Sequence, residues 1–286
     1  MPLTTTGELV TRAAAARSAV ASFNVITLEH AEAVVAGAES AGAPVVLQIS
    51  ENAVRYHGGR LLPLARAAAT CAEQAAVPVA LHLDHVRSDA LLHQAADAGF
   101  SSVMYDAARL PYDENLAATR AAADWAHSRG LWIEAELGRI GGKNGGAPLD
   151  AHAPGARTDP DEARVFVADT GVDALAVAVG SSHAMTTRTA ALDHALLKRL
   201  SAALDVPLVL HGSSGVPDAE LTAAIAGGIA KVNIGTALNI ALTGAVRAFL
   251  AAHPEAVDPR GCLSAAREAM TGTVARALRT LGAATA

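Results

Sequence analysis

Three histidines follow short apolar segments of this sequence, and together they could bind one metal ion. They are His85 in VALHLDH, His183 in LAVAVGSSH and His211 in PLVLHGSSG. Short apolar runs that alternate with helical segments are typical of parallel barrel strands, and barrel enzymes gather catalytic groups beyond the C-terminal ends of such strands. Three neutral imidazoles leave one coordination position open on a zinc ion, as in catalytic zinc sites. The pattern therefore predicts a metalloenzyme.

Asp84 directly precedes the first of these histidines. Its carboxylate could act as a general acid/base beside a bound substrate. It could instead orient a histidine that binds the metal. Adjacent strand residues usually point in different directions, so we expect the acid/base role for Asp84.

Glu134 and Glu136 are two residues apart on one strand-like run and share a face. Carboxylates inside a barrel are costly to bury unless a cation accompanies them. One of the two could bind a second divalent ion together with Asp106. An internal ion pair with Lys231 or an arginine explains the same residues equally well.

Two segments rich in small residues, HGSSG (211–215) and GGIAKVNIGT (227–236), follow the last two strand-like runs. Barrels commonly bind phosphate there through backbone N–H groups and a helix N-terminus. Gly212, Ser213 and Ser214 allow close approach of the backbone, and Thr236 adds a hydroxyl. Taken together, the two segments predict a phosphate site.

The elements that must position these residues repeat along the chain. Alanine-rich helical segments separate eight strand-like runs, near 19–24, 45–50, 77–84, 101–106, 131–137, 174–180, 207–212 and 231–236. This alternation predicts parallel βαβ units closed into a (β/α)₈ TIM barrel. We expect residues 1–286 to form one barrel domain, with one or two extra C-terminal helices over about 255–286 and a mobile functional loop over about 138–160.

Composition excludes several classes of protein. The chain is 51% hydrophobic and 3% aromatic, carries a formal charge of −6 and has two cysteines. An acidic balance argues against nucleic acid as a partner, and two cysteines make no disulfide framework. No segment reaches the ~18 apolar residues of a membrane span, and the N-terminus does not resemble a signal peptide. These features predict a cytoplasmic protein that acts on a small molecule.

Eight segments resemble the class II, metal-dependent fructose- or tagatose-bisphosphate aldolases. They are FNV (23–25), HLDH (82–85), SVMYDA (102–107), EAELGRIGG (134–142), LAVAVGSSH (175–183), LVLHGSSG (208–215), KVNIGTALN (231–239) and DPR (258–260). They occur in the order of the family and span nearly the whole chain.

The resemblance implies a zinc ion bound by His85, His183 and His211, and a proton exchanged between Asp84 and the C4 hydroxyl of a ketose. Glu136 and Asp106 match positions that can take a second divalent ion. The residues expected to bind the phosphorylated ketose or triose are Asn24, Ser50, Ala184, Gly212, Ser213, Ser214, Asn233, Ile234, Gly235, Thr236 and Arg260. Arg260 matches an arginine supplied by a neighbouring subunit, so a homodimer or homotetramer is implied.

Three positions depart from the family pattern. The loop that usually carries a proton-moving glutamate reads Gly141, Gly142, Lys143, Asn144, Gly145, Gly146 and has no carboxylate. The family usually has a glycine directly after the second zinc histidine, and this sequence has Ala184 there. The N–H of Ala184 can still bind a phosphate or lie beside a monovalent cation. A positive φ there would cost about 1 kcal/mol. Some members of the family have an aspartate between the Asn and the Thr of the last segment, and this sequence has Gly235 at that position.

The sequence thus predicts an aldolase that reversibly cleaves fructose- or tagatose-1,6-bisphosphate to dihydroxyacetone phosphate and an aldehyde such as glyceraldehyde 3-phosphate. Because the loop glutamate is missing, two alternatives stay open. One is an aldolase for a different ketose phosphate. The other is a weak or non-catalytic sugar-phosphate binder. A metal-dependent hydrolase or isomerase of a phosphorylated sugar acid is a further alternative.

Overall fold

Eight parallel strands close into a barrel in the computed structural model, which describes residues 3–138 and 156–282. Each strand pairs with the strand that follows it in the chain, and β8 pairs with β1. The strands are β1 Val20–Asn24, β2 Val45–Ser50, β3 Val79–Val86, β4 Ser102–Tyr105, β5 Trp132–Leu137, β6 Ala174–Val177, β7 Leu208–Leu210 and β8 Ile229–Ile234. The predicted (β/α)₈ TIM barrel is confirmed.

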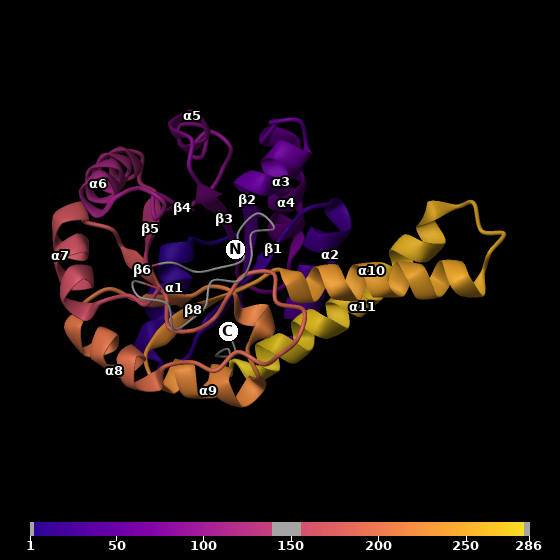
Figure 1. The fold of residues 1–286 in the computed structure, drawn as a ribbon. Helices are drawn as coiled ribbons and strands as arrows, with labels where there is room; N and C mark the ends of the chain where they lie inside the picture. Colours follow the sequence, from indigo (N-terminus) through magenta and orange to yellow (C-terminus); the bar gives the residue numbers. More distant parts are fainter. Residues whose placement is uncertain (1–2, 139–155, 283–286) are drawn as a thin grey trace.

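Helices cover the outside of the barrel (Figure 1). The alanine-rich segments favour helix because alanine has the highest helix propensity, and glycine ends several of them, as Gly42 (φ 61°) and Gly171 (φ 69°) do. The helices are α1 Thr6–Ala15, α2 Leu28–Ala41, α3 Glu51–Tyr56, α4 Leu62–Gln74, α5 Asp89–Leu92, α6 Tyr112–Ser128, α7 Pro160–Thr170, α8 His194–Ala203, α9 Asp218–Ala226, α10 Thr236–Ala252 and α11 Pro259–Thr280.

Helix α1 closes the N-terminal end of the barrel. Leu9 and Val10 on α1 are buried against Val20, Val46 and Ala80 at the starts of three strands. Because this end is packed with apolar side chains, a substrate can enter only at the opposite end, where the C-termini of the strands meet.

Strand β3 differs from the prediction in a way that matters for the site. It runs two residues further than expected, to Val86, and its register against β4 shifts between Leu83 and Val86. Asp84 lies within the strand as expected, and His85 also lies within it and not beyond its end, where it was predicted. His85 has a φ of 50°, a left-handed conformation typical of one class of β-bulge. The bulge turns the chain so that two adjacent side chains both reach the C-terminal opening.

The ends of the last three strands also shift. β6 stops at Val177 and β7 at Leu210, so His183 and His211 lie beyond their strands, as predicted. β8 ends at Ile234, and Thr236 is the first residue of α10. Thr236 thus belongs to a helix N-terminus and not to the strand.

The last two helices leave the barrel together (Figure 1). α11 packs against both α10 and α2, and the far ends of α10 and α11 project from the barrel as an arm. α11 is the extra C-terminal helix that the sequence predicts. Most of the predicted mobile loop, residues 139–155, lies outside the described part of the chain. Among the described helices, we found none with the length and apolar character needed to span a bilayer.

Candidate active site

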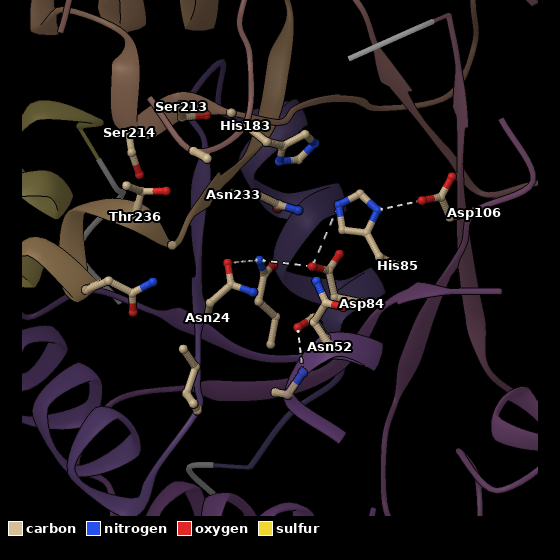
Figure 2. A pocket seen from close by; sticks show the side chains of 18 of the residues that line it. Asn24, Asn52, Asp84, His85, Asp106, His183, Ser213, Ser214, Asn233 and Thr236 are labelled. Carbon is tan, nitrogen blue, oxygen red and sulfur yellow. Dashed lines mark hydrogen bonds and ion pairs between the residues drawn. The ribbon is translucent and has the colours of Figure 1, made fainter. Parts of the chain in front are cut away.

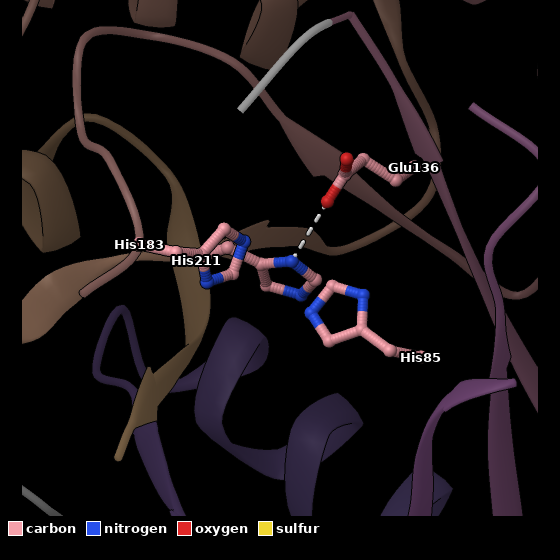
Figure 3. Close-up of side chains that lie close together, drawn as sticks. All are labelled: His85, Glu136, His183 and His211. Carbon is pink, nitrogen blue, oxygen red and sulfur yellow. Dashed lines mark hydrogen bonds and ion pairs between the residues drawn. The ribbon is translucent and has the colours of Figure 1, made fainter. Parts of the chain in front are cut away.

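Four side chains converge at the C-terminal opening of the barrel (Figure 3). His85, Glu136, His183 and His211 each offer one potential ligand atom, and these atoms lie within 4.8 Å of one another. The ring centroid of His85 lies 5.1 Å from that of His183 and 4.9 Å from that of His211. The three histidines singled out in the sequence therefore meet, and imidazole and carboxylate donors in this number suit a zinc ion.

Carboxylates orient two of the three imidazoles. Asp106 Oδ2 lies 3.0 Å from Nδ1 of His85, and Glu134 Oε1 lies 2.9 Å from Nε2 of His211. Metal-binding histidines commonly bond a carboxylate through their second nitrogen, which fixes the ring and its tautomer. The nitrogens left for a metal are Nε2 of His85 and Nδ1 of His211. Asp106 is not a member of the four-residue cluster, so its role as a ligand of a second ion stays a prediction.

Glu134 and Glu136 of β5 have different partners. Lys231 Nζ donates to Glu134 Oε2 over 2.8 Å, and both side chains are buried. Burial raises the pKa of Glu134, but Lys231, His211 and His82 together outweigh burial and hold the pKa well below its usual range. The predicted internal ion pair with Lys231 thus exists at Glu134. Glu136 lies 2.9 Å from Nδ1 of His211 and belongs to the metal-type cluster.

His211 is fully buried between these two carboxylates. Burial lowers its pKa, but the bonds to Glu134 and Glu136 prevail and raise the pKa to about 9. The site therefore attracts positive charge at this position. A divalent cation at Nδ1 would satisfy the same electrostatic demand with the imidazole neutral.

Asp84 lies beside the metal cluster without joining it (Figure 2). Its Oδ2 is 4.0 Å from Nε2 of His85 and accepts a 3.5 Å hydrogen bond from Gln48, which also donates to Asn24 Oδ1 over 2.9 Å. Burial raises the pKa of Asp84, but the nearby His85, His211, His82 and Lys231 side chains lower it overall. The group is therefore a carboxylate near neutral pH and can accept a proton from a bound molecule.

A cavity of about 490 Å³ opens above these residues. The predicted site residues that line it are Asn24, Ser50, Asp84, His85, Asp106, His183, Ala184, Gly212, Ser213, Ser214, Asn233, Gly235 and Thr236. Ile234, Glu136 and His211 are buried next to lining residues without lining it themselves. All the predicted site residues except Arg260 therefore either line this cavity or lie next to residues that line it.

In the cavity wall formed by the segments after β7 and β8, a bound ligand can come close to the backbone. Gly212 has a φ of 67°, and a Cβ there would lie 2.6 Å from the carbonyl of Ser182. Ser214 Oγ accepts a hydrogen bond from the N–H of Ala237 in the first turn of α10. Asn233 is 6% exposed, and neither polar atom of its side-chain amide has a partner among the described residues. A buried amide without partners is costly, so this wall is prepared for a polar ligand.

Comparison with known proteins assigns the chain to a family. Residues 4–286 match the family model described as fructose-bisphosphate aldolase class-II. The chain belongs to the class II fructose-bisphosphate aldolase family. It is 38% identical to a fructose-bisphosphate aldolase of Geobacillus stearothermophilus over 99% of this chain and 98% of that protein, and 36% identical to the fructose-bisphosphate aldolase of Staphylococcus aureus strain N315 over the same shares of both chains.

Solved structures agree with this assignment. The crystal structure of the YdjI aldolase from Escherichia coli K12 superposes with a TM-score of 0.84 at 32% identity, covering 98% of both chains. The resemblance noted in the sequence is confirmed. The protein is a class II aldolase, a carbon–carbon lyase with a His/Glu metal-binding cluster, and its substrate is a phosphorylated sugar.

Ala184 takes the strained conformation that the family comparison anticipated. Its φ is 59°, a left-handed value that favours glycine. The residue still lines the cavity directly after His183. The positive φ considered from the sequence is thus present, on an alanine and not on a glycine.

Arg260 is the predicted site residue that lies apart from the others. It is the second residue of α11, its side chain is 88% exposed, and its guanidinium forms an ion pair with Asp258. It does not line the cavity of its own chain. The prediction that it serves a neighbouring subunit of the aldolase is not tested by a single chain.

Sequence reasoning missed several polar residues of the cavity. They are Gln48, Asn52, Tyr56, Arg87 and Asn239. Gln48 carried a usable signal, because it lies two residues from Ser50 on the same strand and strand side chains alternate with a period of two. Asn52 and Tyr56 lie on the short helix α3, which follows β2 directly.

Proposed function

We propose that this class II aldolase cleaves fructose- or tagatose-1,6-bisphosphate to dihydroxyacetone phosphate and glyceraldehyde 3-phosphate with a zinc ion. The observation that carries the proposal is the convergence of three imidazoles and one carboxylate within 4.8 Å beside the cavity at the C-terminal end of the barrel. Zinc fits this donor set, since Asp106 holds one ring nitrogen of His85 and Glu134 holds one of His211, and the second nitrogen of His211 lies against Glu136, itself a member of the cluster. His85, His183 and His211 are the proposed zinc ligands, which leaves one coordination position open for the substrate. Asp106 and Glu136 are the proposed ligands of a second divalent ion.

When bound, the metal would supply Lewis acidity at the ketone carbonyl. The chain's own residues position the substrate and move a proton. The proposed phosphate cradle consists of Gly212, Ser213, Ser214, Asn233, Ile234, Gly235 and Thr236, with Ala184 offering its N–H to the phosphate or a monovalent cation. As the C3–C4 bond breaks, Asp84 takes the proton of the C4 hydroxyl, and Gln48, which also donates to Asn24, holds the carboxylate in place. Ser50 lies on the same side of the cavity as Asp84.

The proposal extends to the assembly. We propose that residues 1–286 form one catalytic domain and that two or four copies assemble, so that Arg260 of one copy reaches the cavity of another. Its exposed position near the start of α11, on the arm, supports this reading.

The deciding experiment is metal removal during cleavage. We expect release of triose phosphate from a ketose 1,6-bisphosphate to stop after chelation and to return when zinc is added. Activity that survives chelation and is lost on borohydride reduction would instead indicate a Schiff-base enzyme. Formation of a product other than triose phosphate would favour a hydrolase or isomerase.

A second measurement addresses the missing loop glutamate, since Lys143 and Asn144 lie outside the described residues. We expect the C3 proton of dihydroxyacetone phosphate to exchange with solvent deuterium, about 10²–10⁴-fold more slowly than with an intact acid/base group. The variant Asn144→Glu should raise this rate. Binding of dihydroxyacetone phosphate without any exchange would favour the sugar-phosphate-binding alternative.

A further inference from the structure

Arg87 lines the active-site cavity with a guanidinium that no described residue engages. The residue follows β3 and is two positions beyond His85. Its Nε is buried and has no hydrogen-bond partner within residues 3–138 and 156–282. A buried cationic donor without a partner is costly, and a bound anion would remove that cost.

The backbone of Arg87 is anchored independently of its side chain. Its N–H donates to Glu51 Oε2 over 2.7 Å, which ties the end of β3 to the start of α3. Because the donor is the backbone N–H, the substitution Arg87→Met leaves that bond in place. The guanidinium is therefore not needed to hold this part of the fold.

The topology of the barrel places Arg87 across the opening from the proposed phosphate cradle. β3 and β7 are four strands apart in a closed barrel of eight, and hence on opposite sides. Gly212, Ser213 and Ser214 follow β7, whereas Arg87 follows β3. A ketose whose C1 phosphate lies at β7 and β8, and whose C4 hydroxyl lies at Asp84 on β3, directs the rest of its chain towards Arg87.

The charges on this side of the cavity complete the argument. Among the residues known to line the cavity, Arg87 is the one lysine or arginine. Arg55 donates a hydrogen bond to Asn52, another lining residue, so a second guanidinium lies near the same wall. Arg260 of the same chain is exposed and ion-paired on the arm.

We propose that Arg87 binds a terminal anionic group, phosphate or carboxylate, on the aldehyde half of the ketose, and so determines specificity for the far end of the substrate. This inference rests on the proposed aldolase function and adds a residue that selects the substrate. A guanidinium presents paired donors that match the oxygens of either anion.

The experiment compares wild type and Arg87→Met on three substrates that differ only at C6. These are a ketose 1,6-bisphosphate, a ketose 1-phosphate with a neutral C6, and a ketose 1-phosphate with a C6 carboxylate. We expect kcat/KM for the anionic substrate that the enzyme prefers to fall about 10- to 100-fold in Arg87→Met, with kcat/KM for the neutral one unchanged. The larger loss identifies the anion as phosphate or carboxylate. Arg12→Met, on α1 at the closed end of the barrel, is the matched control and should behave as wild type.

Equal losses on all three substrates, or no loss on either anionic one, would overturn the proposal. A binding arm separates this outcome from failure of the proposed function. Titration with hexitol 1,6-bisphosphate and hexitol 1-phosphate needs no turnover. Wild type should prefer the bisphosphate, and Arg87→Met should lose that preference. If wild type released triose phosphate from none of the substrates, the aldolase proposal would fail, and the titration would still decide the role of Arg87.

Discussion

At the scale of single residues, the site depends on one backbone irregularity. Adjacent residues of a regular strand point to opposite faces, yet Asp84 and His85 both line the cavity. The left-handed φ of His85 and the shifted register of β3 make this arrangement possible. A metal ligand and a proton acceptor can therefore come from consecutive positions.

This division of roles predicts a selective defect for Asp84→Asn. We expect kcat for cleavage to fall about 10²–10⁴-fold, because the amide cannot accept a proton. The bound zinc should remain at the wild-type stoichiometry, since Asp84 is outside the metal cluster. Steady-state kinetics and metal analysis on the same preparation check both parts. The exposed Asp97→Asn is the control, and loss of zinc together with activity would mean that Asp84 holds the metal.

Ala184 gives a prediction about stability. Replacement by glycine relieves a left-handed φ of 59°, so Ala184→Gly should raise the free energy of unfolding by about 1 kcal/mol. The same exchange at Ala121, an exposed position within α6, should lower it by about 0.5–1 kcal/mol. Denaturant unfolding of both variants measures the difference. A loss of stability in Ala184→Gly would mean that the methyl group makes contacts that outweigh the strain.

At the scale of elements, the sequence predicted the strands and helices, because these depend mainly on interactions between residues close together in the chain. Apolar runs and alanine-rich segments determine strands and helices within a few residues of their position, and the order of eight units predicted the barrel. The bulge in β3 was not predictable, because it depends on pairing with β4. The distinct roles of Glu134 and Glu136 depend on Lys231, which is 97 residues from Glu134 in the sequence. The sequence of β5 alone does not indicate which glutamate meets this lysine.

The ion pair that links β5 and β8 can be tested with two variants. The first removes only Lys231, and the second also removes the charge of Glu134. Lys231→Met leaves Glu134 charged and buried, so we expect it to lower the free energy of unfolding by about 3–5 kcal/mol. Adding Glu134→Gln removes the unpaired charge and should restore a large part of this loss, since glutamine can still bond His211. Chemical denaturation of the two variants is the measurement. Equal destabilisation of the single and double variants would show that packing, and not charge, dominates here.

At the scale of the whole molecule, the arm formed by α10 and α11 is poorly explained by a single copy. Ile240 and Leu250 on α10 are 46% and 45% exposed, and Val257 between the helices is 96% exposed. Exposed apolar side chains grouped on one projecting element commonly mark a protein interface. Arg260 lies on the same arm. One partner, a second copy of this chain, would account for both the predicted role of Arg260 in a neighbouring cavity and the apolar surface.

We accordingly expect light scattering to give a mass of at least a dimer for the wild type, and a lower mass for the double variant Ile240→Glu, Leu250→Glu, because two buried carboxylates at an interface are costly. If Arg260 completes the site of a neighbour, dissociation must also remove Arg260 from that site. The dissociated variant and Arg260→Met in an intact oligomer should then lose kcat/KM on the bisphosphate to the same extent, while both retain zinc. A fully active monomer would show that each chain binds the far end of its substrate with its own residues, and Arg87 would then be the sole arginine available for that purpose among the described residues of the cavity.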